Sequence, residues 1–348
     1  MGISELLLLL GFLVLIGLIL FIDLFLVGKQ AHLVSTKEAL AWSVIWFLIA
    51  MGFYLFLRYY GHLLHGIDSP ERLKHVISEY APNLLRKSGD YATLLDLYRQ
   101  NMSINYMTGY FIEETLSVDN LFVILLILQS FGVQHKNYKT VLFWGILGAI
   151  VLRFIFIFAG AALIHQFHWI LYIFGAFLIF QGIKILFEKN EEAADVQDHP
   201  VVKYLRNHFS IYPRYVKDHF FVHKGAKRFI TPLLIVVVMI EFSDLVFAMD
   251  SIPAVFAVTS DPYVVFFSNI FAIIGLRSLF FLLANIITKF RFLKAGVSLL
   301  LVFVGVKLLA GEFLTKIGFE SQHSLFVILG ILSLSVLLSV LFPKKENG

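Results

Sequence analysis

The sequence predicts an all-α fold: a polytopic transmembrane helical bundle of about nine spans that contains two inverted three-helix repeats. Three observations support it: the composition, the long apolar runs and a pair of similar blocks. Of the 348 residues, 59% are hydrophobic and 15% are charged, which is far more apolar than a soluble domain. There is no cysteine, so disulfides, thiolate metal sites and a cysteine nucleophile are excluded.

Nine apolar runs are long enough to cross a bilayer, which takes about 20 helical residues. The first run has Glu5 where a signal peptide has a basic region, and no small-residue cleavage site follows it. We therefore expect a retained helix there. The predicted spans are residues 4–27, 39–58, 107–131, 139–163, 168–188, 230–258, 262–288, 292–312 and 322–342.

Lys and Arg collect beside alternate span ends. The connector 189–229 has eight of them against five Asp or Glu, and smaller groups occur at 29–37, 136–139, 289–294 and 344–345. All five regions fall on one side if there are nine spans, and positive loops favour the cytoplasm. We expect a multi-pass protein of the bacterial inner membrane, with the N-terminus outside and the C-terminus cytoplasmic. This bias accounts for the net charge of +4 without a nucleic-acid partner.

The long connector between the second and third spans carries two helix-start signals. Ser69 precedes a proline, and Asp90 precedes YATLLDLYRQ. We expect short helices on the outer surface, which either roof the entrance or form an ordered linker with no role in transport. The predicted segments are two N-terminal helices (1–60), this connector (61–106), repeat 1 (107–188), the basic connector (189–229), repeat 2 (230–313) and a last span with its tail (314–348).

Two three-span blocks match when the sequence is shifted by about 124 residues. GILGAIVLRFIF (145–156) lies over NIFAIIGLRSLF (269–280), FQGIKIL (180–186) over FVGVKLL (303–309), and SVDNLFV (117–123) over EFSDLVF (241–247). Three matches in the same order favour an internal repeat. The aligned pairs are Ser117 with Glu241, Asn120 with Asp244, Arg153 with Arg277, and Lys184 with Lys307.

A repeat with an odd number of spans inserts its second copy upside down, so the two blocks are predicted to be inverted. In transporters of this kind the substrate site lies near the midplane at the repeat interface, often where helices are broken. Pro253 lies inside a predicted span, and a proline there frees a backbone carbonyl. We expect a broken helix within residues 240–258.

The first helix of each block carries acids that are expensive inside a membrane, at about 2.5–3.5 kcal/mol or more for a charge at the bilayer centre. Helical spacing puts these side chains on or beside one face of each helix. The donors are all oxygens, which suits Mg²⁺, Ca²⁺ or Mn²⁺. The predicted metal site consists of Glu113, Asp119, Asn120, Glu241, Asp244 and Asp250, supported by Ser117, Ser251, Met249, Arg153, Arg277 and Lys307.

The same charges permit another interpretation. Asp119 and Asp250 would pair with Arg153 and Arg277, while Lys307 neutralises another acid, and paired charges need no ligand. Both interpretations hold together if the basic groups hold the acids whenever no cation is bound.

Three further assignments follow from the residues. Met249 is either a thioether ligand that tolerates Mn²⁺ or a packing residue. Glu114 faces away from Glu113 and is expected to meet water or headgroups. No Ser/His/Asp set lies at matching membrane depth, so we expect neither an enzyme nor an organic cofactor.

Three long motifs resemble those of the TerC family, most closely its Alx-type branch, which is similar in ancestry to the LysE-type exporters. They are EETLSVDN (113–120), IEFSDLVFAMDSIPAVFAV (240–258) and SNIFAIIGLRSLFFLL (268–283), and the resemblance covers residues 1–343. It implies Mn²⁺ export, metalation of secreted enzymes or tellurite resistance. It also implies a metal-handling set of Glu113, Asp119, Glu241, Asp244 and Asp250.

The expected function is secondary transport by alternating access, with Mn²⁺ as the exported substrate and protons as the exchanged ion. Two alternatives remain: transport of Ca²⁺ or another cation, and a membrane scaffold that passes metal or stabilises a secretion complex without transport. The expected partners are the divalent cation, protons and the lipid bilayer. A homo-oligomer or a secretion-system partner stays open.

Overall fold

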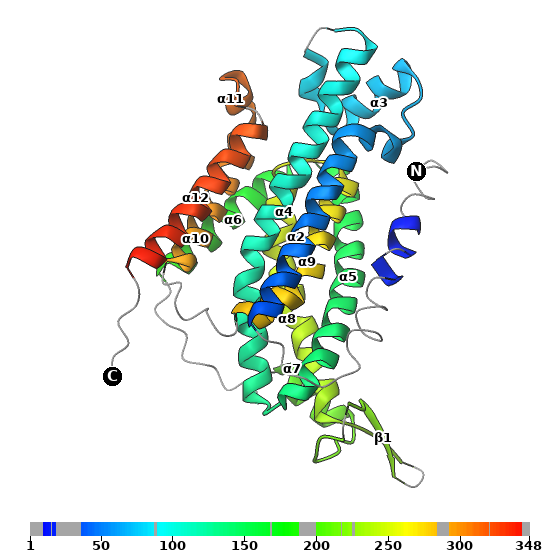
Figure 1. Cartoon of the computed structure of the whole chain (residues 1–348), viewed down its shortest axis with the longest axis vertical. Coiled ribbons are helices and arrows are strands. Elements are labelled where there is room, and N and C mark those ends of the chain that lie inside the picture. The colour runs from blue at the N-terminus through cyan, green and yellow to red at the C-terminus, as the bar shows by residue number, and fades with distance from the viewer. Residues whose placement is uncertain are drawn as a thin grey trace.

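Long helices that run side by side make up the computed structural model (Figure 1). It describes residues 10–14, 16–18, 36–86, 89–167, 169–187, 200–216, 218–224, 227–283, 292–319 and 321–342. The longer helices are α2 (Thr36–Tyr60), α4 (Tyr91–Ser130), α5 (His135–Gln166), α6 (Ile170–Phe187), α8 (Pro232–Phe256), α9 (Pro262–Leu283), α10 (Leu293–Leu309) and α12 (Ser321–Leu341).

Shorter elements lie toward the two ends of the bundle. In Figure 1 α3 and α11 are at the upper end, and α7 and β1 are at the lower end. The strands β1 and β2 pair antiparallel, with Phe221 opposite Ile230, in a connector where the sequence indicated no strand. These elements are η2 (Gly61–His65), α3 (Pro70–Tyr80), η3 (Pro82–Arg86), α7 (Pro200–His208), β1 (Phe221–Lys224), β2 (Lys227–Ile230) and α11 (Gly311–Lys316).

The predicted all-α polytopic class is confirmed. Five described helices are long and apolar enough to cross a membrane: one runs through α2 and η2 (Lys37–His65), and the others lie within α5, α6, α8 and α12. Helices α9 and α10 contain shorter apolar helices. Most of the predicted first span, residues 4–27, lies outside the described residues. The total of nine spans therefore stays a prediction.

Both helix-start signals of the outer connector are confirmed. The Ser69 hydroxyl accepts a hydrogen bond from the Arg72 backbone N–H at 3.3 Å and caps α3. A carboxylate oxygen of Asp90 accepts from the Thr93 N–H at 3.0 Å and caps α4. However, α4 does not end within the connector: it is 40 residues long and ends at Ser130. The short helix expected after Asp90 is thus the outer part of one long helix.

The helices of the two predicted repeats pack reciprocally. Helix α4 contacts both α8 and α9, helix α5 contacts the same two, and α6 packs along α10. This is the pattern that a two-fold relation between the blocks would give. The repeat itself stays a prediction.

Small residues bring α6 and α10 into backbone contact. A Cβ on Gly305 would lie 2.6 Å from the carbonyl oxygen of Gly175, and one on Gly182 would lie 2.7 Å from that of Ser298. The Ser298 hydroxyl donates to the Gly182 carbonyl at 2.5 Å. Such close approach needs residues without a side chain. In the predicted alignment Gly182 corresponds to Gly305, so the two contacts are reciprocal as well.

The centre of the bundle is rich in aromatic side chains. Phe12 meets Phe267 edge-on with ring centroids 4.4 Å apart, and Phe53 lies 4.8 Å from Phe271. Large apolar side chains also point outward from the long helices, among them Leu48, which is 59% exposed. Outward apolar side chains are what a helix surrounded by lipid requires.

The upper end is held together by polar contacts between connectors. The His65 Nε2 atom lies 2.9 Å from a carboxylate oxygen of Asp261, and both side chains are buried. The other oxygen of Asp261 accepts from the Tyr263 N–H at 2.9 Å, at the start of α9. Nearby, the Arg99 guanidinium of α4 donates a hydrogen bond to the Nδ1 atom of His62 at 3.1 Å. These contacts tie η2 to α4 and to the turn between α8 and α9.

Candidate functional site

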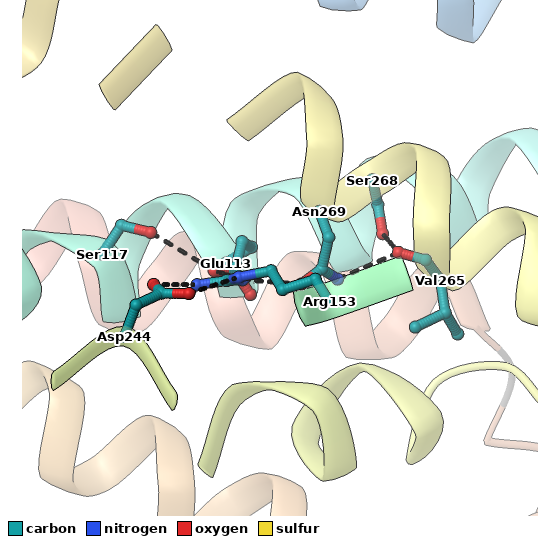
Figure 2. Close-up of polar contacts among 7 residues, drawn as sticks. All are labelled: Glu113, Ser117, Arg153, Asp244, Val265, Ser268 and Asn269. Atoms are coloured by element: carbon teal, nitrogen blue, oxygen red, sulfur yellow. Dashed lines mark hydrogen bonds and ion pairs between the residues drawn. The ribbon is translucent and has the colours of Figure 1, made fainter. Parts of the chain in front are cut away.

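A single arginine joins four helices at the centre of the bundle. The Arg153 guanidinium, on α5, forms ion pairs with Glu113 of α4 and with Asp244 of α8, the latter at 3.0 Å. It also donates to the Asn269 amide oxygen, on α9, at 2.7 Å. Figure 2 shows the three acceptors around one guanidinium. Arg153, Glu113 and Asn269 are at most 1% exposed. We call Arg153, Glu113, Asp244 and Asn269 the Arg153 cluster.

Neighbouring side chains orient the cluster. The Asn269 amide nitrogen donates to the Val265 carbonyl one turn earlier, at 2.9 Å, which leaves its oxygen facing Arg153. The Ser117 hydroxyl lies 3.4 Å from a carboxylate oxygen of Glu113. These contacts follow from i, i+4 spacing within α9 and α4. The cluster is therefore held by the helices themselves and needs no connecting loop.

The cluster contains one fixed positive charge and two carboxyl groups. Breaking a buried ion pair by removing one partner typically costs about 3–5 kcal/mol, because the other charge is left uncompensated. One carboxylate oxygen of Glu113, Oε2, is buried without a hydrogen-bond partner. The cluster thus keeps an unfilled acceptor even with Arg153 in place, and an added proton or cation would fill it.

A third acid of this region, Glu241, packs against Gly148. The Glu241 carboxylate, on α8, occupies the space beside Gly148 of α5, where a Cβ on the glycine would overlap it. Its Oε2 atom is buried without a hydrogen-bond partner. The same holds for Oε2 of Glu114 on α4. Buried carboxylate oxygens without donors are costly in a static structure and are expected where ions or protons are exchanged.

Asp250 faces a different helix from Asp244. Its carboxylate accepts from the Gln181 amide of α6, at 3.1 and 3.3 Å. Six residues on an α-helix correspond to a rotation of about 240°. The side chains of Asp244 and Asp250 therefore point in different directions from an intact helix and cannot bind the same ion. Asp244 and Asp250, which were predicted as members of one metal site, therefore lie apart in this structure.

The expected break is absent because α8 continues past its proline. Pro253 lies inside the helix, which runs unbroken from Pro232 to Phe256. The proline carbonyl still accepts from the Ala257 N–H at 3.0 Å. Pro253 is less than one turn from the helix end, so it deprives only the Met249 carbonyl of a donor without interrupting the path of the chain.

Comparison with known proteins identifies the family. The model of the integral membrane protein TerC family matches residues 98–347. The chain belongs to the TerC family. The resemblance of the three sequence motifs to this family is thereby confirmed, and the protein is an integral membrane protein with several apolar helices.

Relatives align with nearly the whole chain. A protein of Salmonella typhi named "Putative membrane-bound redox modulator Alx" is 40% identical over 330 residues, which covers 94% of this chain and 92% of the relative. The protein of the same name in Escherichia coli K12 is 39% identical, with the same coverage of 94% and 92%. An uncharacterised membrane protein of Myxococcus xanthus is 38% identical and covers 95% and 91%. No solved structure matches the chain.

The structure brings together only part of the predicted site. Glu113, Ser117, Asp244 and Arg153 meet, but the guanidinium lies between the acids where a metal ion was expected. Arg153 does pair with acids inside the bundle, but its described partners are Glu113 and Asp244, whereas Asp250, which was expected to pair with an arginine, bonds to Gln181. Among the described residues, no three His, Asp or Glu side chains lie close enough to hold a metal ion.

The remaining predicted residues lie elsewhere. Met249 is 59% exposed, so its thioether points away from the acids. Lys307 forms no ion pair with a described acid, contrary to the expectation that it neutralises one. Asn120 and Ser251 are buried, and the Ser251 hydroxyl has no hydrogen-bond partner. The predicted side chains of Asp119 and Arg277 lie outside the described residues.

Three residues were not predicted as part of the site. Asn269 lies in the third family motif, four residues after Val265, and only its position opposite Arg153 reveals its role. Gln181 lies in the matched segment 180–186, but its repeat counterpart is apolar. Glu114 was expected to meet water or headgroups, whereas its Oε2 atom is buried. A polar residue inside an apolar span was the signal available for all three.

Proposed function

We propose that this TerC-family protein is a secondary transporter that exports Mn²⁺ across the bacterial inner membrane by alternating access, in exchange for protons. The observation that supports this is the Arg153 cluster, in which ionisable groups from α4, α5 and α8 meet in the interior of the bundle. Ionisable groups inside a membrane protein typically mark ion pathways. Carboxylate and amide oxygens are suitable ligands for Mn²⁺.

In this proposal Arg153 is the resident counter-ion of the ion-free state. A divalent cation that approaches Glu113 and Asp244 displaces the guanidinium, because cation and guanidinium compete for the same oxygens. When the cation leaves, Arg153 returns and keeps the two acids compensated. The Asn269 oxygen is a further ligand that either the guanidinium or the metal can use.

Protons supply the driving force in this proposal. Moving charge against the membrane potential costs about 2.3 kcal/mol per charge per 100 mV, and an exported Mn²⁺ carries two charges. Glu241 and Glu114 each have a buried oxygen with no hydrogen-bond donor. These oxygens can accept protons without breaking an existing bond, so proton entry would lower the affinity of the acids for the metal on the outward-facing side.

A second candidate is a membrane scaffold that does not transport. The observation that favours it is the saturation of Arg153 by Glu113, Asp244 and Asn269. A guanidinium whose charge is already compensated by two carboxylates needs no ligand, and the cluster would then fix the packing of four helices. In that case the protein would pass on metal or stabilise a partner complex through its connectors.

The names of the Alx relatives suggest a redox role for those proteins. This sequence contains no cysteine, so it offers no thiol for disulfide exchange. A redox effect of this protein would therefore act through the metal that it moves, because the cellular Mn²⁺ level would change while the protein itself is not oxidised.

Transport into reconstituted liposomes tests the proposal. We expect Mn²⁺ uptake to rise when a pH gradient is imposed, and to fall at least about tenfold in Asp244→Asn, which corresponds to about 1.4 kcal/mol. Asp250→Asn is expected to slow uptake as well. Asp96→Asn, an exposed acid on α4, is the matched control and should transport normally. Competition by Ca²⁺ distinguishes Mn²⁺ selectivity from general cation transport.

Two outcomes would reject transport through this site. Uptake that is indifferent to Asp244→Asn and Asp250→Asn would exclude these acids from the pathway. No flux from folded protein, together with co-purification of a partner through the 189–229 connector, would favour the scaffold.

A further inference from the structure

A large cavity lies among residues of η3, α4, α10 and α11. Figure 1 shows α11 and α3 at the same end of the bundle. The volume of the cavity is about 930 Å³, which lies in the range of small-molecule sites. Its walls come from η3, α4, the turn between α8 and α9, and the helices α10, α11 and α12. The cavity is separate from the Arg153 cluster. Asn105, which lines it, precedes Glu113 by eight residues on α4, or about 12 Å along the helix.

The charge that lines this cavity is positive. Lys307 of α10 and Lys316 of α11 both contribute to the wall, and none of its described lining residues is Asp or Glu. Lys307 is partly buried and makes no hydrogen bond or ion pair with the described residues. A partly buried ammonium group without a counter-ion is unfavourable. An anion in the cavity would provide the missing partner.

Neutral polar groups also line the cavity. Asn105 donates to the Asn101 side-chain oxygen at 3.0 Å, which leaves its own amide oxygen buried without a donor. Thr259 and Ser260, from the turn between α8 and α9, also face the cavity. Donors and acceptors together suit a ligand that has anionic oxygens and at least one O–H or N–H group.

We infer that this cavity binds a phosphate-type oxyanion, held by Lys307 and Lys316 and oriented by Asn105. The oxyanion is either free in solution or part of a phospholipid headgroup. Both share the same recognition chemistry, and the apolar lining residues Phe256 and Leu308 leave room for an acyl chain beside the polar wall. The inference does not rest on the proposed transport of Mn²⁺.

Binding to the purified full-length protein in a neutral detergent tests the inference. Three probes are compared by the ligand-dependent shift of the unfolding temperature: inorganic phosphate, phosphatidylglycerol and diacylglycerol. We expect phosphate, phosphatidylglycerol or both to bind, and diacylglycerol to have no effect. Binding of phosphate identifies a free oxyanion as sufficient, whereas binding of phosphatidylglycerol alone identifies the lipid headgroup. Lys307→Gln should weaken anion binding about tenfold or more.

The repeat offers a matched control. Lys184 is the predicted counterpart of Lys307, is exposed, and does not line the cavity. Lys184→Gln should leave anion binding unchanged. If Lys307→Gln fails to fold, Lys316→Gln replaces it as the test. Lys316 is exposed and tolerates substitution, and its replacement should weaken anion binding severalfold. The inference is overturned if neither anion binds the wild-type protein, if folded lysine variants bind normally, or if Lys184→Gln weakens binding as much.

Discussion

The acids on the two sides of helix α8 have different interaction partners. On the side that packs against α5, Asp244 is paired with the Arg153 guanidinium and Glu241 is pressed against Gly148. On the side that packs against α6, Asp250 accepts a hydrogen bond from the neutral amide of Gln181, and Lys184 of the same helix is close enough to act on it as a positive charge without a described ion pair. How strongly an acid of α8 is held therefore depends on whether the neighbouring helix contributes a charged or a neutral partner.

This difference separates a structural role from an exchange role. A buried carboxylate paired with a guanidinium resists removal of either partner. A carboxylate bonded to a neutral amide loses little when its charge changes, because asparagine or a protonated acid can make a similar hydrogen bond. We therefore expect Asp244 to determine stability more strongly than Asp250, even if both acids take part in transport.

Substitution of Arg153 should have the largest effect. Arg153→Gln leaves the buried Glu113 and the partly buried Asp244 without their counter-ion, so we expect a destabilisation of about 3–5 kcal/mol. Thermal unfolding in detergent measures it. Asp244→Asn in the same background should restore part of the loss, because it removes one uncompensated charge. Additive effects of the two substitutions would show that the pair is not coupled.

Gly148→Ala tests the other contact on the α5 side. The new Cβ would overlap the Glu241 carboxylate, and overpacking of this kind costs about 1–3 kcal/mol. Gly52→Ala in α2 is the control, since no atom lies within 4 Å of its Cβ, and a gain of about 0.5–1 kcal/mol is expected there. Equal melting temperatures for the two variants would mean that Glu241 moves away from α5 at no cost.

Asp250→Asn tests the α6 side. We expect a change of less than about 1 kcal/mol in the free energy of unfolding, because the new amide can still bond to Gln181. Parallel unfolding curves of Asp250→Asn and Asp244→Asn decide the comparison. If Asp250→Asn proved the more destabilising, the α6 side would hold its acid more tightly than its contacts indicate.

Much of the fold was predictable because membrane helices carry strong local signals. Apolar runs predicted α5, α6, α8 and α12 to within a few residues, and the polar caps Ser69 and Asp90 marked two helix starts. The hairpin β1–β2 was not predicted, because its four-residue strands lie in a charged connector with no clear alternation.

The site was predictable by residue type but not by pairing. Costly acids inside apolar spans identified Glu113 and Asp244 correctly as interior groups. Sequence spacing could not show which acid meets Arg153, because partners on different helices are set by helix rotation and tilt. The same limit hid Gln181, whose only role in the described contacts is to face Asp250. The prediction that Pro253 breaks its helix was wrong because the residue is too close to the end of α8 to interrupt it.

Removal of the ion pair between Arg58 and Asp96 should change the free energy of unfolding least. This exposed pair is a reference for the buried pair of Arg153. Its N–O distance is 2.6 Å, and the Asp96 side chain is 55% exposed. Exposed pairs contribute about 0.2–1 kcal/mol, reduced further by salt. The hydrogen bond from Arg58 lowers the pKa of Asp96 below its usual 3.8, so the contribution is present above pH 3.8 and is lost as the pH falls through the lowered value. Asp96→Asn should therefore be slightly destabilising at pH 7 and neutral at a pH below that value, as measured by unfolding at both. If Asp96→Asn were as destabilising at pH 7 as Arg153→Gln, solvent exposure would not explain the difference between the two ion pairs.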